Sequence, residues 1–575
     1  MLVALCAVLL AALPAGLCST ITDLRCGGLL TNADSTTVYP FPPQDIPLSW
    51  NWGGGPLPSS FEVVISDGQA DIWSSGMIPS SSPTFVLPAA LRGNLAPGGT
   101  FRWRVQTTSP TNETLSISDQ ANLDIAPSPA DWEGAEWIGG ASQLRTDWTL
   151  GAPVLSARAY VAALGVFELH VNGQTVGTHR MDPGESVYDQ AVLYVGFNIT
   201  SLLRNGANAV GALLGNGKYG YLDIFVNRTT LGDQSGDSSR ALKLIAHAHL
   251  ADGSVATLQT TAAGWRTRHG PIVYDHSWHG EIYDARNEVL SPAWDASPLA
   301  AYAPDVWARS ASAITVGAVA AKLRPQLMEP IRIIQTIKPV AVAASPTSLV
   351  FDFGINLAGT TELTFARPVR ARYALDNAEE VTIKLRIKHS EITYTNGSTY
   401  NNFYPGMEQM HGGSATCSMV DWYKDKWYEC ANQTDAYIFT VLPNATKAFI
   451  TFTPTFTYHG FRFAELTAVE LQLDGTEMPL RPELAALFPF DAALVAHQAH
   501  SSVNRLTSLR ISPDVGGLAA GVLGSIFNAT LQSHVSQLWS IPTDCPQREK
   551  RGYALLIGCT LILLSKVFGI LPVNT

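Results

Sequence analysis

The residues with the clearest chemical potential lie near the C-terminus, in the run DCPQREKRGY at 544–553. This run sets two carboxylates, Asp544 and Glu549, among an amide and several cations, behind a Cys-Pro pair that disfavours a regular helix. Glycoside hydrolysis needs such a set, because one carboxyl group protonates the leaving oxygen while other polar groups hold sugar hydroxyls or activate water. A solvated surface turn is the alternative interpretation of the same charges.

The longer string SIPTDCPQREKRG, at 540–552, closely resembles the signature loop of the bacterial-type α-L-rhamnosidases. The resemblance implies β-sandwich modules followed by an (α/α)6 barrel whose active site this loop lines. It also implies that Glu549 is the general acid, that Asp544 holds the rhamnose hydroxyls and that Arg548 lies beside it. Tyr553 departs from the family, which usually has Trp at this position.

The sequence after this loop also departs from the family pattern. The resemblance implies a Gly-Asp stretch and several hundred residues of barrel that carry the catalytic base, whereas 554–571 read ALLIGCTLILLSKVFGIL. The apolar tail, 554–575, can be a marginal membrane span or anchor signal, a buried barrel helix, or foreign sequence joined to the family pattern. We expect a barrel truncated within its motif, with the acid present and the base missing.

The composition favours a secreted, β-rich protein. The formal net charge is −11, 15% of the residues are charged, and no Lys/Arg block is present that could follow a phosphate backbone, so nucleic acid is not an expected partner. Residues 1–19 form an apolar run that ends in small residues, which is typical of a signal peptide. We expect a secreted, extracellular protein, with membrane anchoring through the apolar tail as the alternative.

Glycosylation sequons and cysteines agree with this compartment. The sequons lie at Asn112, Asn198, Asn227, Asn396, Asn432, Asn444 and Asn528. Cys417 and Cys430 bracket the stretch CSMVDWYKDKWYEC, and we expect a disulfide between them that closes this loop. No metal site is expected from these cysteines, because neither has the neighbours of a CxxC or CxxH motif.

The chain divides into modules. Residues 24–127 alternate apolar and polar residues in short runs and resemble a fibronectin type III β-sandwich. Residues 131–310 contain period-two runs joined at Asn172-Gly173, which predicts an antiparallel sandwich, and they resemble the rhamnosidase N-terminal domain, which binds sugar with calcium in some relatives. Calcium is therefore possible in this module, although we expect no other cofactor.

Three charged residues of the second module are candidates for contacts. Glu281, Asp284 and Arg286, in GEIYDAR, could touch a sugar or the barrel, or form a satisfied polar network between domains, which we favour.

Residues 314–473 resemble the concanavalin-like domain of the same family and predict a further sandwich. His389 and Glu391 share one face of a strand there, and we interpret them as surface positions. From about residue 480 the period changes: Asp491 followed by Leu494 and Val495 predicts a helix, so 480–553 are expected to begin the barrel. The predicted fold class is multidomain and mainly β: tandem antiparallel β-sandwiches followed by the start of an (α/α)6 barrel.

Two classes of function follow. The first is an inverting α-L-rhamnosidase that removes terminal rhamnose from rhamnose-containing glycosides, glycans or polysaccharides. The second is a non-catalytic, secreted carbohydrate-binding or interaction protein made of the β-sandwich modules.

Overall fold

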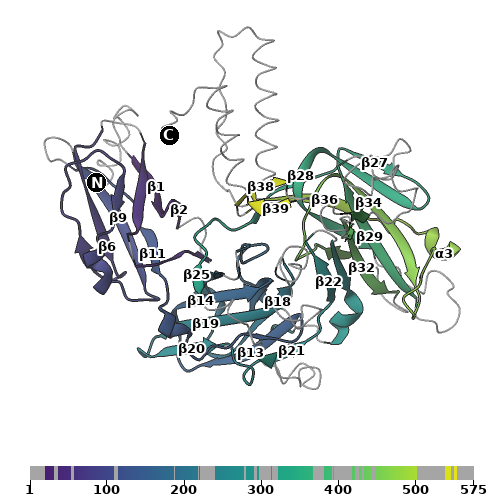
Figure 1. Ribbon diagram of the computed structural model, residues 1–575, viewed down its shortest axis with the longest axis horizontal. Helices are drawn as coiled ribbons and strands as arrows, with labels where there is room; N and C mark the ends of the chain where they lie inside the picture. The colour runs from purple at the N-terminus through teal and green to yellow at the C-terminus, as the bar shows by residue number, and fades with distance from the viewer. Residues whose placement is uncertain are drawn as a thin grey trace, which may run out of the picture.

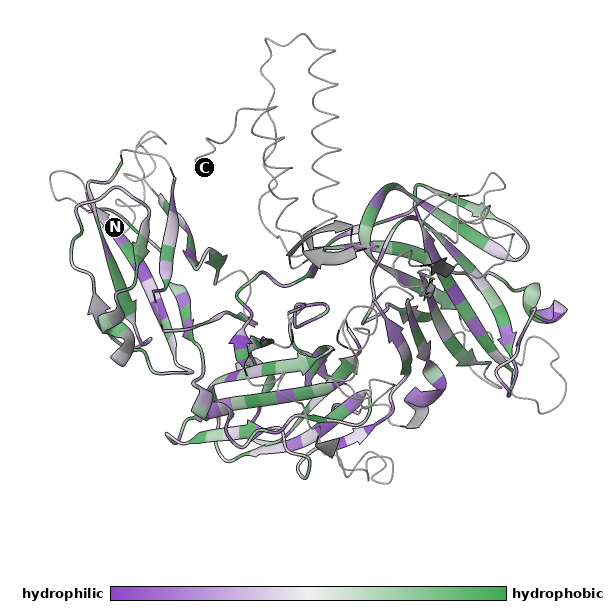
Figure 2. Ribbon diagram, in the orientation of Figure 1, coloured by the Kyte–Doolittle hydropathy of each residue, from purple (hydrophilic) through white to green (hydrophobic). Residues whose placement is uncertain are grey.

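The structure of the chain is a computed structural model. The structure describes residues 20–31, 36–43, 45–53, 57–108, 114–186, 188, 190–217, 219, 240–277, 280–290, 294–296, 312–313, 322–366, 381–391, 393, 418–420, 427–429, 433–441, 449–500, 538–539, 541–545 and 549–552. The described part is mainly β and forms three lobes in chain order (Figure 1). Hydrophobic and hydrophilic residues alternate along many strands (Figure 2), as expected where one face of a sheet is buried.

The first module consists of two facing sheets, ordered β2-β1-β5-β8 and β4-β11-β9-β6-β7, with β10 beside β9. Its core contains Trp50, Phe61 and Trp103, which alternate with outward residues along their strands. The strands are β1 (Thr20–Cys26), β2 (Leu29–Leu30), β4 (Pro40–Phe41), β5 (Pro47–Gly53), β6 (Ser60–Ser66), β7 (Asp71–Ser74), β8 (Thr84–Val86), β9 (Thr100–Thr108), β10 (Thr114–Ile117) and β11 (Ala121–Ile125).

The second module is a sandwich of two mainly antiparallel sheets, ordered β24-β12-β19-β14-β17-β25 and β16-β15-β18-β13-β21, in which β17 and β25 pair in parallel. Strand β20 pairs with β19, and β3 (Thr37–Val38), from the first module's sequence, pairs with β17. The strands are β12 (Ile138–Gly139), β13 (Gln143–Leu150), β14 (Val154–Leu164), β15 (Val166–Val171), β16 (Gln174–Thr175), β17 (Val192–Asn198), β18 (Gly206–Gly215), β19 (Ala241–Leu250), β20 (Val255–Gln259), β21 (Arg266–Arg268), β24 (Ser312–Ala313) and β25 (Leu323–Pro325).

The predicted Asn172-Gly173 turn is confirmed. Val171 pairs with Gln174, so the loop has two residues, and both have positive φ, 51° for Asn172 and 84° for Gly173. This is the conformation that a tight hairpin requires and that Asn-Gly adopts readily.

The third module contains a large sheet ordered β22-β23-β32-β29-β34-β28-β36-β26, with β27, β33 and β35 paired beside it. Phe353, Phe365, Phe439 and Phe461 lie in its core. The elements are β22 (Ile272–His276), β23 (Gly280–Asp284), β26 (Arg332–Ile337), β27 (Ala341–Ala344), β28 (Ser348–Ala366), β29 (Thr382–Ser390), β32 (Thr434–Thr440), β33 (Phe449–Phe452), β34 (His459–Leu471), β35 (Glu477–Met478), β36 (Ala493–His500) and the single-turn helix α3 (Pro482–Ala485).

Strands β22 and β23 lie in the third module's sheet although their sequence falls within the second module. Strand β23 pairs in parallel with β32, Tyr283 opposite Tyr437, and the two rings stack at 5.4 Å. The structural boundary therefore differs from the one that the sequence predicts, because a hairpin from 272–284 extends the sheet of the following module.

The helix predicted from Asp491 is wrong where the structure describes it. Asp491 has a positive φ of 54°, and residues 493–500 form strand β36, with Leu494 opposite Leu363 of β28. Leu494 and Ala496 are buried on alternating positions, so the short apolar run follows the period of a strand. Short apolar runs fit the period of a helix as well as that of a strand, and here the pairing with β28 and β26 decides for the strand.

Candidate functional site

The predicted catalytic residues lie on a backbone hairpin. Asp544 is on β38 (Ile541–Cys545) and Glu549 begins β39 (Glu549–Gly552), and Cys545 is the antiparallel partner of Glu549. The fold thus brings the backbones of Asp544 and Glu549 to within one register step of each other. Arg548 lies outside the described residues.

Glu281 of β23 is fully buried at the junction of the second and third modules. Its carboxyl group accepts hydrogen bonds from the backbone N–H of Thr455, at 3.1 and 3.0 Å, and of Phe456, at 2.8 Å. The Phe456 ring in turn packs with Val166 of the second module. Glu281 therefore forms part of a polar network beside the contact between these modules, in line with the interpretation favoured from the sequence.

Asp284 and Arg286 bind each other. The guanidinium of Arg286 donates to both carboxylate oxygens of Asp284, at 2.8 and 2.6 Å. Asp284 is buried, whereas the side chain of Arg286 is 42% exposed. Sugar contacts by these two residues stay a prediction.

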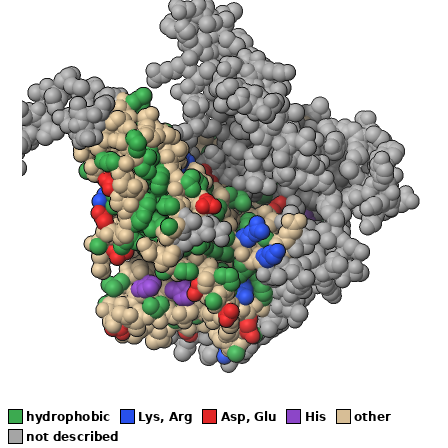
Figure 3. Space-filling view, turned by 60° about the vertical axis from the view of Figure 1, so that its left-hand side comes forward, with side chains coloured by type: hydrophobic (Ala, Val, Ile, Leu, Met, Phe, Trp, Pro, Cys, Tyr) green, Lys and Arg blue, Asp and Glu red, His purple; other side chains and the backbone are tan. Residues whose placement is uncertain are grey.

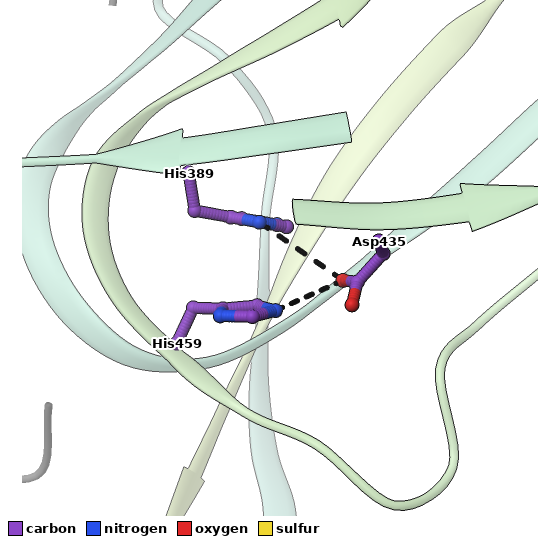
Figure 4. A group of neighbouring side chains, drawn as sticks. All are labelled: His389, Asp435 and His459. Carbon is purple, nitrogen blue, oxygen red and sulfur yellow. Dashed lines mark hydrogen bonds and ion pairs between the residues drawn. The ribbon is translucent and has the colours of Figure 1, made fainter. Parts of the chain in front are cut away.

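A buried cluster adjoins Glu281. Asp435 of β32 accepts a hydrogen bond through Oδ1 from the backbone N–H of Glu281, at 2.9 Å, and its Oδ2 lies 3.0 Å from Nε2 of His459. The imidazoles of His459 and His389 stack at 4.1 Å with 16° between their planes (Figure 4). All three residues are buried, so the interpretation of His389 as a surface position is wrong.

The three side chains contain the ligand types of a transition-metal site, and their ligand atoms lie within 4.8 Å of one another. The hydrogen bonds do not fit that use. Nδ1 of His389 lies 3.1 Å from the carbonyl oxygen of Gln433, which only accepts, so Nδ1 carries a proton, and Nε2 can accept from the hydroxyl of Thr361 at 3.0 Å. The nitrogen of His389 that faces Asp435 thus has no lone pair to offer.

The protonation of the cluster follows from the same geometry. Burial, together with the neighbouring His459, lowers the pKa of His389 to about 3, so this imidazole is neutral at physiological pH. Burial by itself would raise the pKa of Asp435, but attraction to His459 and the hydrogen bond from it outweigh burial and hold that pKa below its ordinary value. While Nε2 of His459 lies against Asp435, its Nδ1 is buried and has no hydrogen-bond partner among the described protein atoms.

A second carboxylate connects this cluster to the second module. Asp275 of β22 is the cross-strand partner of Glu281. Its Oδ1 accepts from the backbone N–H of Asn216 at 2.6 Å, and its Oδ2 lies 3.3 Å from the guanidinium of Arg240. The hairpin β22–β23 therefore bonds to the second module through Asp275 and to the third through Glu281.

A separate charged group lies within the second module. His170 of β15 lies between Asp295, 2.9 Å from its Nδ1, and Glu168, 2.9 Å from its Nε2. Burial disfavours its charged form, but the hydrogen bonds to Asp295 and Glu168 and their negative charges outweigh burial and raise the pKa of His170 to about 9. The group fixes the segment 294–296 to the sheet.

Several predicted residues lie outside the described part of the chain. They are Cys417, Cys430, Asn112, Asn227, Asn396, Asn432, Asn444 and Asn528. A short ladder, β30 (Ser418–Val420) with β31 (Trp427–Glu429), falls between the two cysteines in sequence. Asn198 is described, and its Oδ1 accepts from Arg158 at 2.9 Å and from the Thr200 hydroxyl at 2.6 Å.

Sequence reasoning missed Asp275, Asp435 and His459. Each is a polar residue in a strand-forming run, and such residues usually face solvent. The one available signal of a buried polar site was a polar residue at a position of an apolar strand that is expected to point inward. The partners of such a residue come from distant segments, so the sequence does not identify them.

Lys and Arg side chains form no long stripe on the described surface shown in Figure 3. No helix among the described residues is long and apolar enough to cross a membrane.

Comparison with known proteins defines the class of these modules. Residues 152–335 match the alpha-L-rhamnosidase N-terminal domain, and residues 342–479 match the bacterial alpha-L-rhamnosidase concanavalin-like domain. The chain therefore belongs to the bacterial-type α-L-rhamnosidase family. The first of these matches includes the hairpin β22–β23, which the fold assigns to the sheet of the second.

Two curated relatives illustrate the sequence similarity. An alpha-L-rhamnosidase of Formosa agariphila is 25% identical over 87% of this chain and 49% of its own length. One of Streptomyces avermitilis is 29% identical over 61% of this chain and 29% of its own. The chain thus spans about half the length, or less, of these relatives.

Solved structures share the fold. The alpha-L-rhamnosidase from Dictyoglumus thermophilum superposes with a TM-score of 0.69 at 22% identity, covering 96% of this chain and 56% of that one. The Streptomyces avermitilis alpha-L-rhamnosidase complexed with L-rhamnose gives a TM-score of 0.65 at 17% identity, and the superposition covers 92% of this chain and 61% of that one.

Proposed function

We propose that this protein acts as an α-L-rhamnosidase that removes terminal rhamnose from glycosides, glycans or polysaccharides. The observation that carries the proposal is the order of two rhamnosidase domains followed by the DCPQRE loop, whose backbone brings Asp544 and Glu549 together. The names of the relatives and the L-rhamnose bound to one of the similar structures support rhamnose as the sugar.

In this proposal Glu549 is the general acid. It donates its proton to the glycosidic oxygen as the bond to the anomeric carbon breaks, while water attacks the opposite face and the configuration inverts. Asp544 and Arg548 hold the hydroxyls of the rhamnose. A second carboxylate activates the water, and it would stand roughly 6.5–9.5 Å from the acid.

We further propose that the protein is secreted. The apolar run at 1–19 and the glycosylation sequons support this proposal. Calcium in the second module stays a prediction. Asp182, a buried carboxylate of that module, is already bonded to His179 and to the side-chain amide of Gln326.

The test is hydrolysis of an aryl α-L-rhamnoside by the protein extended into a complete barrel, which supplies the base, compared with Glu549→Gln in the same protein. We expect release of rhamnose that falls by about 10²-fold or more in the variant, because general acid catalysis contributes on that scale. Glu136→Gln is the matched control, since Glu136 accepts a hydrogen bond from the backbone N–H of Ala262 in the second module. Rhamnoside binding without turnover would favour the non-catalytic carbohydrate-binding function.

A further inference from the structure

Two histidines lie on the outward face of strand β19 in the second module. Every second residue of this strand, from Leu242 to Leu250, belongs to the buried core between the two sheets. His247 and His249 alternate with these core residues, so both imidazoles leave the opposite face of the sheet. His247 is half-buried and His249 is exposed. The proposed rhamnosidase chemistry uses neither of them.

The backbone holds the two histidines at a fixed spacing. Strand β19 is paired along both edges here, since His247 lies between Arg158 of β14 and Thr257 of β20, and His249 pairs with the same two strands. Residues two apart on a strand are separated by roughly 6.6 Å, and side chains on strands lean along the strand direction. The two imidazoles can therefore turn toward one ion without a change in the backbone.

The ring of His247 suits a metal ligand. Its Nδ1 lies 3.4 Å from the hydroxyl oxygen of Thr257. When Nδ1–H donates to this hydroxyl, Nε2 keeps its lone pair for a metal ion, which is the arrangement that metal-binding histidines usually show. Burial lowers the pKa of His247, the charge of Asp131 opposes that fall, and the neighbouring His249 adds to it, so the imidazole is neutral at neutral pH.

The charged groups on this face do not exclude a cation. Arg158, opposite His247, donates to the buried carboxylate of Asp124 at 3.1 Å, so its positive charge is balanced. Lys243 is a further cation on the same face, four residues from His247 along the strand, and the negative charge of Asp131 acts on His247 itself. Two acids thus offset two cations around the histidine pair.

We propose that His247 and His249 form a surface site for a late first-row transition-metal ion, with Cu²⁺ bound most tightly. The two imidazoles supply two ligands, and water or a donor atom from another molecule completes the coordination. Imidazole nitrogen suits Cu²⁺, Ni²⁺ and Zn²⁺, and Cu²⁺ stands highest in the order of affinities of these ions. Ca²⁺ and Mg²⁺ prefer oxygen ligands, so they should not bind at this pair.

Calorimetric titration of the tag-free full chain with Cu²⁺ at neutral pH tests the site. Binding should weaken by about tenfold or more in His247→Gln and in His249→Gln, because each variant removes one of the two ligands. Ni²⁺ and Zn²⁺ should bind more weakly than Cu²⁺. Acidification should weaken the binding of all three ions, since a protonated imidazole has no lone pair. Electron paramagnetic resonance of bound Cu²⁺ should show coupling to nitrogen that changes in each variant.

A third histidine provides the matched control. His269, which follows β21, is exposed and should retain the Cu²⁺ affinity when it is replaced in His269→Gln. Circular dichroism of the variants checks that each one is folded. An absence of Cu²⁺ binding, an affinity that is unchanged in either His247→Gln or His249→Gln, or an equal loss in His269→Gln would overturn the proposal.

Discussion

The backbone N–H of Glu281 donates a 2.9 Å hydrogen bond to the carboxylate of Asp435, 154 residues further along the chain. This bond joins a hairpin from the rhamnosidase N-terminal domain to the sheet of the concanavalin-like domain. Gly280, just before it, has a φ of 110°, and an added Cβ would lie 2.2 Å from the carbonyl oxygen of Thr434. The two family domains are thus one packed unit at this junction.

Substituting Gly215 should destabilise the junction. Gly215→Ala places a methyl group against the Cβ and proximal ring atoms of Phe456, which cannot move aside freely, so we expect a loss of about 1–3 kcal/mol in the free energy of unfolding. Denaturant titration measures it. Gly151→Ala is the control, since nothing lies within 4 Å of its added Cβ. Equal stability of the two variants would contradict the packing described here.

The group around His170 should make stability depend on pH. Because the folded pKa of about 9 exceeds the ordinary value of 6.5, the contribution of His170 is fully present below about pH 6.5 and is lost as pH rises through 9. The rise of about 2.5 pKa units corresponds to roughly 3 kcal/mol. His170→Gln should remove this alkaline loss in thermal melts between pH 6 and 10, whereas His249→Gln, at an exposed position, should retain it.

Asp435 should be among the most sensitive polar positions. Asp435→Ala leaves the N–H of Glu281 and the Nε2–H of His459 buried without their acceptor, so we expect a loss of about 3–5 kcal/mol. Asp252→Ala is the control, because Asp252 is exposed in a turn, where it accepts from Ser254, and its loss should cost far less. Chemical unfolding of both variants measures the two costs, and a cost for Asp435→Ala below that of Asp252→Ala would refute the buried network.

The predicted disulfide between Cys417 and Cys430 has a direct chemical test. Peptide mapping without reduction should recover both cysteines in one linked peptide pair, because a secreted chain meets an oxidising environment and the spacing suits a closed loop. Alkylation of both thiols in the native, unreduced protein would count against the pairing.

Local chemistry made part of the fold predictable from sequence. Asn172-Gly173 specifies its hairpin because few residue pairs readily adopt positive φ at both positions. Phe101, Trp103 and Val105 alternate with polar residues, so they mark the inward face of their strand whichever strands pair with it. The family motifs identified the two rhamnosidase domains for the same reason, since each is a contiguous string.

Pairing between distant segments decided the rest. The run at Leu494 fits the period of a helix as well as that of a strand, and its hydrogen bonds with β28 and β26 make it a strand. The local sequence of His389 suggests a surface position, but its imidazole stacks on that of His459 in the buried interior. The sequence by itself determined the turns, the inward faces and the family. Only the tertiary structure decided to which module's sheet the hairpin of Glu281 belongs and which acidic residues lie beside it. The reason is that burial and charge coupling arise between residues that no local sequence pattern connects.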